Sequence, residues 1–500
     1  MIERVPQASR LKPGSELGRA SHAPRDRRAR IAVDLGAESG RVSLLRWPED
    51  QPEITEIHRI PNAPVQHGSS LHWPIAKILA GLDEGLRKAA NEATEGVASI
   101  AVDGWAVDYV RLDRTGHPLH DPFCYRDERT IAAKQKADAA LSPEGVFLRT
   151  GAQPLRINTL YQLLADPDHE QQAPWLCLPE FVLHWLGAPR VAEYTNATHT
   201  GLVDLATGNW AFDIFKQLEI PIEGVPRIVA PGTHLGKMRG PLTALAAFHD
   251  TDLIAPACHD TASAIAGIPA DLDATAYICS GTWSLVGTLV AQPIATPKAL
   301  TARYTNQGAA TGGFCFHSNV NGMWLMKQCI DAWTSVGRNV ALSDLIQQAT
   351  ACTSAETINV DAEPLLLAGN MPARINEQIT AAGHQPIADV PGNEPLFARV
   401  ILESLAARYA IALADLELML NRKLDRIHII GGASRNRLLA HLTAQHTGLP
   451  VDCGHPESST IGNFAVQVAA SEESHARVTR NGVRRWASLL SNPIPQPSSH

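Results

Sequence analysis

The sequence contains no long apolar run and no excess of positive charge. Of its 500 residues, 45% are hydrophobic and 19% are charged, and the formal net charge is −8. No stretch approaches the roughly 20 consecutive apolar residues that a membrane-spanning helix needs. A chain without a basic patch also lacks the positive surface with which proteins bind nucleic acids. These absences argue against a membrane or a nucleic acid as a partner and favour a globular protein of more than one domain.

Cysteine is scarce, and its spacing matches no metal or redox motif. The eight Cys are scattered and never occur as C-x-x-C, the spacing typical of zinc sites and redox motifs. We interpret them as free thiols in a reducing compartment, which predicts a cytoplasmic protein. The loop G-x-x-x-x-G-K-[ST] is also missing, so the sequence does not support a P-loop nucleotide site.

Residues 1–29 differ in composition from the rest of the chain. They contain Arg, Pro, Ser and Gly but little periodic apolar content and no secretory signal, so we expect a disordered tail. An organelle transit peptide or a start codon assigned too early are the alternatives. Transit peptides are poor in acids, and this segment has three of them: Glu3, Glu16 and Asp26. We expect a second flexible tail over 491–500.

Two segments, one in each half of the chain, share a pattern of apolar run, small-residue turn and second apolar run. They are IAVDLGAESGRVSLL (31–45) and AYICSGTWSLVGTLV (276–290), and each predicts a β-hairpin. Alternating strand and helix patterns follow both, which indicates an α/β architecture. We therefore predict two α/β lobes, 30–267 and 268–490, that meet at the turn-rich break Gly267–Asp271.

Further segments predict individual elements of these lobes. Pro74 opens an amphipathic helix, and helices are expected near 320–335 and 395–420. Residues 99–113 (SIAVDGWAVDYVRLD) predict two buried strands around a glycine. Residues 426–442 (RIHIIGGASRNRLLAHL) predict a strand, a glycine turn and a helix.

The turns of the two hairpins have the composition of phosphate-binding loops. In the first, Asp34 ends a strand, and the small turn after it lets backbone N–H groups approach phosphate oxygens, while the carboxylate can hold Mg²⁺ through water. In the second, Gly281 and Thr282 offer an N–H and a hydroxyl. Each turn alone also fits a plain hairpin, but two such turns facing each other can bind one triphosphate from both sides.

Two further segments carry side chains or glycines suited to ligand binding. Gly431 and Gly432, between a strand and a helix, let a flat ring such as adenine approach the backbone, although they do not match G-x-G-x-x-G. The segment CHDTASA (258–264) predicts a closely packed helix start. In one interpretation, Asp260 or Thr261 caps this helix. In the other, Asp260 is a general base at the junction of the lobes.

Together these segments resemble the FGGY carbohydrate kinases of the actin-like ATPase superfamily. The resemblance runs from about Ile31 to about Ala470 and includes VDLGAESGR (33–41), VDGWAVDYVRLD (102–113), YRDERT (125–130), TGAQPLRINTLYQLLA (150–165), EYTNATHTGLVDLATGNW (193–210), HDTASA (259–264), SGTWSLVG (280–287), TNQGA (305–309), IIGGASRN (429–436) and ESSTIGNFAVQ (457–467). It implies a two-lobed actin-like ATPase (ribonuclease-H-like) α/β fold with ATP in the interlobe cleft.

The resemblance also implies roles for the matching residues. Asp260 would be the proton acceptor, and Asp34 would lie near the Mg²⁺. The sugar would be contacted by Ala106, His259, Asp260, Thr261 and Asn319. ATP would be contacted by Ala37, Glu38, Ser39, Gly40, Arg41, Thr282, Lys327, Gly431 and Gly432.

Within that family, INTLYQLLA (157–165) and EYTNATHTGLV (193–203) resemble the kinases of L-rhamnulose rather than those of glycerol or xylulose. This implies phosphorylation of L-rhamnulose at its 1-hydroxyl, with ATP and Mg²⁺, to give L-rhamnulose 1-phosphate, by a monomer or homodimer that binds only a small ketose and ATP.

Three departures from the family's pattern affect the predicted substrate. Ala106 stands where the family has a sugar-site glycine, Lys327 stands where it has a glutamine, and 361–371 match poorly. A kinase of L-fuculose or another ketose is therefore an alternative. A non-catalytic sugar sensor with an actin-like fold is a second alternative, although it would not need both phosphate turns and Asp260. An actin-like filament protein or chaperone would lack the HDTASA and INTLYQLLA segments.

Overall fold

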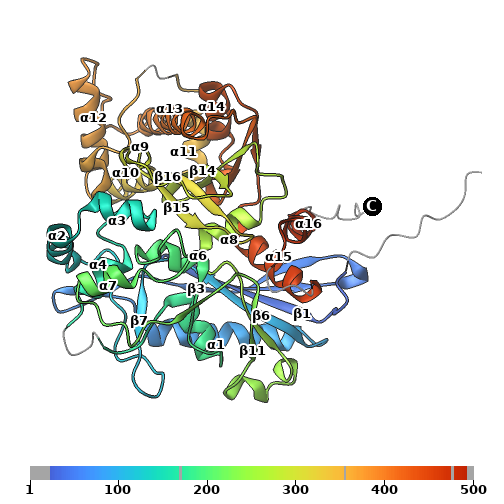
Figure 1. The fold of residues 1–500 in the computed structure, drawn as a ribbon. Helices are drawn as coiled ribbons and strands as arrows, with labels where there is room; N and C mark the ends of the chain where they lie inside the picture. Colours follow the sequence, from blue (N-terminus) through green and yellow to red (C-terminus); the bar gives the residue numbers. More distant parts are fainter. Residues whose placement is uncertain (1–22, 168–171, 354–355, 474–477, 492–500) are drawn as a thin grey trace, which may run out of the picture.

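The computed structural model describes residues 23–167, 172–353, 356–473 and 478–491. Two six-stranded mixed sheets form two lobes, one above the other in Figure 1. The first sheet has the order β11-β12-β6-β1-β2-β3, with β1 (Ala29–Leu35), β2 (Ser39–Arg46), β3 (Glu53–Pro61), β6 (Val97–Gly104), β11 (Thr233–Lys237) and β12 (Asp252–Ala255). The second has the order β15-β16-β14-β13-β17-β18, with β13 (Thr275–Ser280), β14 (Trp283–Val290), β15 (Tyr304–Gly308), β16 (Phe314–Asn321), β17 (Arg426–Ile430) and β18 (Val451–Cys453).

The two sheets share one topology over five strands. In the first, β3-β2-β1 are antiparallel neighbours and β6 and β12 continue parallel to β1. In the second, β16-β14-β13 are antiparallel and β17 and β18 continue parallel to β13. The predicted hairpins are therefore β1–β2 and β13–β14, and they lie in separate sheets. Because parallel strands end at the same edge, each sheet presents a row of strand carboxyl ends.

Shorter strands and helices complete the first lobe. The two-stranded sheets pair β4 (Val65–His67) with β5 (Ser70–His72), β7 (Tyr109–Arg111) with β8 (Trp175–Cys177), and β9 (Val191–Glu193) with β10 (Arg227–Val229). The helices are α1 (Ile75–Glu92), α2 (Thr130–Ala140), α3 (Pro143–Thr150), α4 (Thr159–Leu164), α5 (Leu178–Trp185), α6 (Tyr194–Ala197), α7 (Phe212–Gln217) and α8 (Asp260–Ala266), with the 3₁₀ turn η2 (Thr198–Thr200) after α6. As expected, α1 follows Pro74 and buries one face.

The second lobe carries its helices mainly on one side of its sheet. They are α9 (Pro297–Thr301), α10 (Trp324–Ser335), α11 (Leu342–Ala349), α12 (Met371–Ala381), α13 (Glu394–Leu420) and α14 (Arg437–Thr447). The predicted helices near 320–335 and 395–420 correspond to α10 and α13, and the predicted strand-turn-helix of 426–442 corresponds to β17 and α14.

The last two helices return to the first lobe. α15 (Ser458–Glu472) packs on α8, β1 and β6, and α16 (Arg480–Ser491) packs on α15 and α8 (Figure 1). The sequence assigns these residues to the second lobe, but the packing has a clear cause. Side chains alternate across β1, so Ile31 and Val33 face the core under α1, whereas Ala32 faces α15. The second face of a buried parallel sheet has to be covered by helices.

Two glycines allow α8 and α15 to cross at very short range. A Cβ at Gly462 would lie 1.7 Å from the carbonyl oxygen of Ser263, and one at Gly267 would lie 2.4 Å from that of Ser458. Any larger residue at either position would push the helices apart. This crossing fixes the start of α8 relative to the edge of the first sheet.

Part of the expected N-terminal tail contacts the body of the protein. The backbone N–H of Arg25 donates to Glu472 (2.8 Å), and Arg27 forms an ion pair with Asp50. β1 itself begins at Ala29. The rest of that tail, 1–22, and residues 492–500 lie outside the described residues. Within the described part of the chain, no helix combines the length and apolar character required to cross a bilayer.

Candidate active site

Three acidic residues gather at the carboxyl edge of the first sheet. Asp34 and Asp103 are partners in the register of the parallel strands β1 and β6, so their side chains project on the same face. The segment after β12 reaches the same edge, where the carbonyl oxygen of Cys258 accepts a hydrogen bond from the N–H of Gly104 (2.9 Å). Asp260 follows directly. Residues more than 200 positions apart in sequence thus form one acidic site.

Asp34 is almost fully buried but remains close to a cation. It is 3% exposed, and its Oδ2 lies 3.5 Å from Nε of Arg41, which also pairs with Glu457. Burial is the largest influence on the pKa of Asp34 and raises it, and the charge of Asp260 raises it further. Arg41 and a hydrogen bond from Ser459 lower it in part, and the pKa stays above its ordinary value. The predicted metal residue therefore lies in a site where a further positive charge would be stabilising.

Asp103 is a site residue that the motif reading missed. It is fully buried, and burial followed by the charge of Asp34 holds its pKa well above the ordinary value. Its Oδ2 accepts a hydrogen bond from Asn463 (2.6 Å), and no group within the described ranges pairs with its Oδ1. The signal was in the sequence, because β1 and β6 both carry Val-Asp just before their last residue, at 33–34 and 102–103.

α15 holds the two carboxylates in place through polar side chains on one of its faces. Ser459 Oγ donates to Asp34 Oδ2 (2.5 Å), and Asn463 Nδ2 donates to Asp103 Oδ2. Gln467 donates to Asn463 Oδ1 (2.7 Å). The three residues are four apart, so they share one face of the helix. The segment ESSTIGNFAVQ, which follows the second lobe in sequence, therefore orients the acids of the first lobe.

The start of α8 places Asp260 at the rim of this acidic site. The N-cap of α8 is His259, whose Nδ1 accepts a hydrogen bond from the N–H of Thr261 (3.1 Å). The sequence predicts Asp260 or Thr261 as the cap, whereas the N-cap is His259; Asp260 Oδ1 nevertheless also accepts a hydrogen bond from the N–H of Thr261 (2.5 Å). Asp260 lies in the first turn with a side chain 35% exposed, whereas His259 and Thr261 are buried. The carboxylate is thus accessible to a ligand.

A buried glutamate fixes the backbone that precedes Asp260. Glu193 Oε2 accepts hydrogen bonds from the N–H of Cys258 (2.8 Å) and the hydroxyl of Thr195 (2.5 Å), and that hydroxyl in turn accepts one from the N–H of His259 (3.1 Å). Burial raises the pKa of Glu193 to about 8 and that of its neighbour Glu180 to about 7. The segment EYTNATHT thereby positions the loop that carries Asp260.

Ala106 lies in a strained loop between β6 and β7. The next residue, Val107, has φ +71°, a left-handed conformation that β-branched residues rarely adopt. The amide of Gln162 on α4 donates to the carbonyl oxygen of Val107 (3.1 Å) and to Asp108 (3.0 Å), and Asp108 also accepts from the Trp105 indole (2.9 Å). Backbone strain of this kind concentrates at functional sites, and the INTLYQLLA segment supports it here.

The first hairpin turn lies immediately beside Asp34. Ala37 and Glu38 form the tip, and β2 then carries Ser39, Gly40 and Arg41, the last opposite Asp34 in the register. Arg41 is bound by two acids, so its charge is shared with them before any ligand arrives. A role of these five residues in binding ATP phosphates stays a prediction.

In the second lobe, the structure brings the remaining predicted ATP residues to one sheet edge. Gly431 follows β17 with φ +79°, and a Cβ there would lie 3.0 Å from the carbonyl oxygen of Ser280, which precedes the turn with Thr282. Gly432 is exposed. Lys327 is solvent-exposed on α10 and pairs with Asp331 (2.8 Å). The turns of Thr282 and of Gly431–Gly432 are therefore neighbours. The first residue of α10, Trp324, donates its N–H to the carbonyl oxygen of Thr282 (3.2 Å), and Lys327 lies about one helical turn further along α10.

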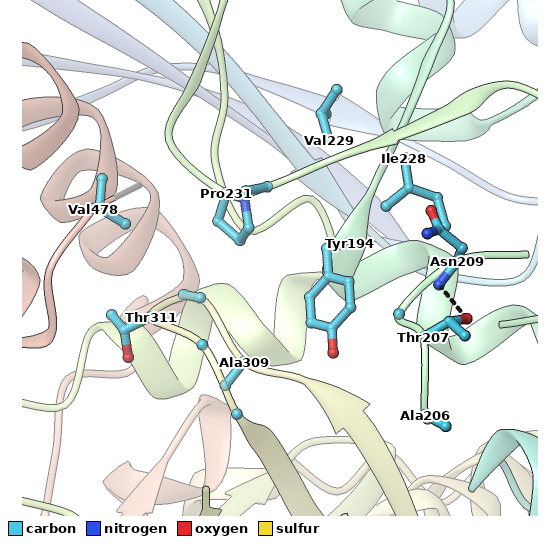
Figure 2. A pocket seen from close by; sticks show the side chains of 15 residues that line it. Tyr194, Ala206, Thr207, Asn209, Ile228, Val229, Pro231, Ala309, Thr311 and Val478 are labelled. Carbon is cyan, nitrogen blue, oxygen red and sulfur yellow. Dashed lines mark hydrogen bonds between the residues drawn. The ribbon is translucent and has the colours of Figure 1, made fainter. Parts of the chain in front are cut away.

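A cavity of about 460 Å³ lies elsewhere at the junction of the lobes (Figure 2). Its lining includes Tyr194, Thr207–Asn209, Ile228–Pro231, Ala309–Gly313 and Val478. None of these described lining residues is Asp, Glu, Lys, Arg or His, so the cavity cannot neutralise a triphosphate. None of the predicted site residues lines it.

The acidic edge fits a magnesium–nucleotide complex. The described residues contain no cluster of three His, Cys, Asp or Glu arranged as a complete metal site. Mg²⁺ commonly binds proteins through one or two carboxylates, with water and phosphate oxygens as its other ligands. Asp34 and the unpaired Oδ1 of Asp103 supply that kind of donor, and the mutual repulsion of the acids favours a cation between them and a polyphosphate.

Two lobes of equivalent topology, with acidic residues at the carboxyl edge of the first sheet, are the arrangement expected of a two-lobed actin-like phosphotransferase. The chain belongs to the FGGY family of carbohydrate kinases: the family's N-terminal domain matches residues 29–267 and its C-terminal domain matches residues 276–471. It is a sugar kinase, and ATP is the phosphoryl donor expected for this family. The expected family, fold class and enzyme class are confirmed.

Proteins named rhamnulokinase are similar over nearly the whole chain. That of Bacteroides thetaiotaomicron is 32% identical over 476 residues, covering 94% of this chain and 95% of the relative. That of Halalkalibacterium halodurans is 33% identical over 448 residues, covering 89% and 94%.

Solved structures share the fold at lower identity. A ligand-bound xylulose kinase from Lactobacillus acidophilus superposes with a TM-score of 0.71 at 16% identity, over 90% of each chain. Plasmodium falciparum glycerol kinase with ADP gives 0.70 at 14% identity, over 93% of each chain. At this identity, the likeness concerns the fold alone.

Proposed function

We propose that this sugar kinase transfers the γ-phosphoryl group of ATP to the 1-hydroxyl of L-rhamnulose. The observation that carries the proposal is the match to rhamnulokinases at about one third identity along some nine-tenths of the chain. The segments INTLYQLLA and EYTNATHT support it further, because they hold the sugar-site loop and the Asp260 loop. We also propose the division into lobes at Gly267–Asp271.

In this mechanism, Asp260 accepts the proton of the attacking hydroxyl. Its carboxylate is exposed at the rim of the acidic edge, and His259 Nδ1 lies 2.9 Å from its Oδ1. The loop is fixed by Glu193 and Thr195, so the base is held in place before the sugar binds. Phosphoryl transfer depends mostly on such positioning and on neutralisation of charge.

Asp34 and Asp103 would hold the Mg²⁺ that accompanies ATP, and this ion would offset negative charge on the phosphates. The turns at 37–41 and 281–282 would contact phosphate oxygens through N–H and hydroxyl groups. The glycines 431–432 would leave room for the adenosine. Closure of the lobes would exclude water, which otherwise competes as phosphoryl acceptor.

Ala106 favours a second candidate, a kinase of another ketose such as L-fuculose. It is buried beside the strained Val107, so its Cβ cannot easily move away from a bound sugar.

A coupled assay of ADP release tests both candidates. The panel contains L-rhamnulose, L-fuculose, D-xylulose and glycerol, with wild type and Ala106→Gly. We expect L-rhamnulose to give the highest kcat/KM of this panel. If wild type prefers another member and the glycine variant shifts toward L-rhamnulose, Ala106 has retuned the pocket and the second candidate is correct. Absence of turnover with every sugar would indicate a non-catalytic sensor.

A further inference from the structure

Several buried polar groups near Asp260 have no partner in the protein. Gln307 on β15 is fully buried, and neither Oε1 nor Nε2 forms a hydrogen bond within the described residues. The same holds, over the described ranges, for Nε2 of the fully buried His317 and for Oδ1 of Asn319 on β16. An unpaired buried amide or imidazole is costly, and native proteins rarely leave several of them together. These groups therefore indicate a ligand.

The strand register places the unpaired groups on one face of the second sheet. Gln307 pairs with Cys315 across β15 and β16, and Cys315, His317 and Asn319 alternate along β16, so all four project on the same side. His317 Nδ1 lies 3.0 Å from the hydroxyl of Tyr277 on the same face. Its Nε2 is the nitrogen left for a ligand.

This face extends away from Asp260 in successive rows. Cys279 is aligned with Asn319 through β14. Burial, and after it the nearby charge of Asp260, raises the pKa of the Cys279 thiol. His317 lies one row further, and Gln307 lies in the row beyond. Each row is two residues along a strand, or about 7 Å. His317 is therefore about 7 Å along the sheet from Cys279, a separation comparable to the length of a six-carbon sugar.

The first lobe supplies the opposite wall. The rings of His199 and His259 meet edge to face with centroids 4.8 Å apart. The turn that carries His199 is tied to β15, because Thr198 Oγ1 accepts a hydrogen bond from the N–H of Gly308 (2.7 Å). His199 Nδ1 is also buried without a partner in the part of the chain that the structure describes. The imidazoles of His199 and His259 in the first lobe are thus neighbours of His317 in the second.

The chemistry of this lining selects a neutral ligand. Gln307 and Asn319 are amides, and burial lowers the pKa of His317 to about 3 and holds that of His199 well below its ordinary value. The ionisable groups that face these imidazoles are His259, Asp260, Tyr277 and Cys315. The two amides and the two imidazoles of lowered pKa can pair with hydroxyl groups but supply no positive charge to a carboxylate or a phosphate.

We propose that Gln307 and His317 bind the terminal hydroxyl of a ketose, at the end of the carbon chain opposite to the hydroxyl that Asp260 deprotonates. The proposal rests on the function proposed above and extends it. L-Rhamnulose ends in a methyl group, whereas L-fructose has the same configuration at every centre and ends in a hydroxyl. A methyl group would leave Gln307 and His317 unpaired, so L-fructose is at least as good a substrate as L-rhamnulose.

Substitution of Gln307 tests this with the matched pair of sugars. Gln307→Met keeps the length of the side chain and removes both polar atoms. We expect kcat/KM for L-fructose to fall by at least about tenfold and that for L-rhamnulose to stay within about threefold. His317→Asn, which keeps a polar group toward Tyr277 and removes Nε2, should act in the same direction. Gln347→Met, at an exposed position of α11, is the matched control.

Thermal melts without sugar separate ligand binding from a structural role. If Gln307 serves the sugar, the methionine variant melts at the same temperature as wild type or higher, since an unpaired buried amide is gone. The proposal is overturned if both sugars lose activity together, if neither does, or if wild type uses L-fructose more than about tenfold less well than L-rhamnulose. The function proposed above fails differently, when L-rhamnulose is not the best substrate among ketoses of other configurations.

Discussion

At the scale of single residues, the site depends on acids whose charges oppose one another. Asp34 and Asp103 are buried side by side, and each has a raised pKa because burial and a neighbouring acid disfavour its charged form. Such groups reduce stability in the empty protein and become favourable when a cation binds. Activity and stability should therefore respond in opposite directions when one of these acids is neutralised.

Asp103→Asn tests this opposition. The amide oxygen can still accept the hydrogen bond of Asn463, but the charge is lost. We expect kcat to fall by at least about tenfold at saturating sugar and the apparent affinity for Mg²⁺ to fall with it, while the melting temperature at pH 8 stays equal or rises. Asp344→Asn, an exposed aspartate on α11, is the control. Normal turnover and normal Mg²⁺ dependence would remove Asp103 from the site.

Glu193 gives a prediction on the pH dependence of stability. Its pKa is raised to about 8 in the folded protein, compared with about 4.3 in an unfolded chain. The folded state thus favours the protonated form, and the resulting stability is complete below pH ~4.3 and is lost as the pH rises through about 8. Relative to Glu193→Gln, which does not titrate, wild type should lose melting temperature between pH 5 and pH 9.

The measurement is a series of melts of both proteins across that range. The control is Glu223→Gln, at an exposed glutamate, which is melted beside wild type over the same pH range. Curves that stay parallel for wild type and Glu193→Gln would show that Glu193 is ionised throughout, and that its hydrogen bonds outweigh its burial.

The sequence predicted some site residues and missed others for a physical reason. Asp34 and Asp260 stand beside turns with a recognisable local composition, at the end of β1 and at the start of α8, and the structure places both at the acidic edge. Asp103 and Glu193 lie at the ends of strands that read as ordinary buried segments. Their importance comes from partners that are distant in sequence, such as Asn463 for Asp103, and local composition does not record such contacts.

At the scale of elements, the crossing of α8 and α15 holds the C-terminal helices against the first lobe. Local periodicity predicted both hairpins, α1, α10, α13 and α14, because each depends on its own pattern of apolar residues. It did not predict that α15 and α16 cover the first sheet, since that choice depends on which face of β1 is left open after α1 has packed. The crossing is where a long-range contact determines the position of Asp260.

Gly462→Ala tests the crossing. A Cβ at this position would lie 1.7 Å from the carbonyl oxygen of Ser263, so α8 has to move away from α15. We expect a loss of about 1–3 kcal/mol in stability, seen as a lower melting temperature, together with a lower kcat because Asp260 moves with α8. Ser471→Ala, at an exposed position of the same helix, is the control. A variant with the melting temperature and kcat of wild type would show that the helices accommodate the methyl group.

At the scale of the whole molecule, the proposed mechanism requires groups from both lobes to meet. The proposed base, the two buried acids and the proposed sugar-site loop belong to the first lobe, whereas the predicted ligand residues Thr282, Gly431–Gly432 and Asn319 belong to the second. α15 begins in the chain after the second lobe and holds the acids of the first through Ser459 and Asn463. The overall two-lobed α/β fold was predictable because the hairpin pattern occurs twice. The packing of α15 and α16 against the first lobe was not predictable from that pattern.

The central claim is that Asp260 is the general base, and one substitution tests it most directly. Asp260→Asn keeps the size of the side chain and the N-cap residue His259, and its amide oxygen can still accept the hydrogen bond that Asp260 Oδ1 receives from the N–H of Thr261. The account predicts that kcat at saturating L-rhamnulose falls by at least about 100-fold, while calorimetry gives an ATP affinity within about threefold of wild type and the melting temperature is unchanged. A correctly folded variant with near-normal turnover would contradict it.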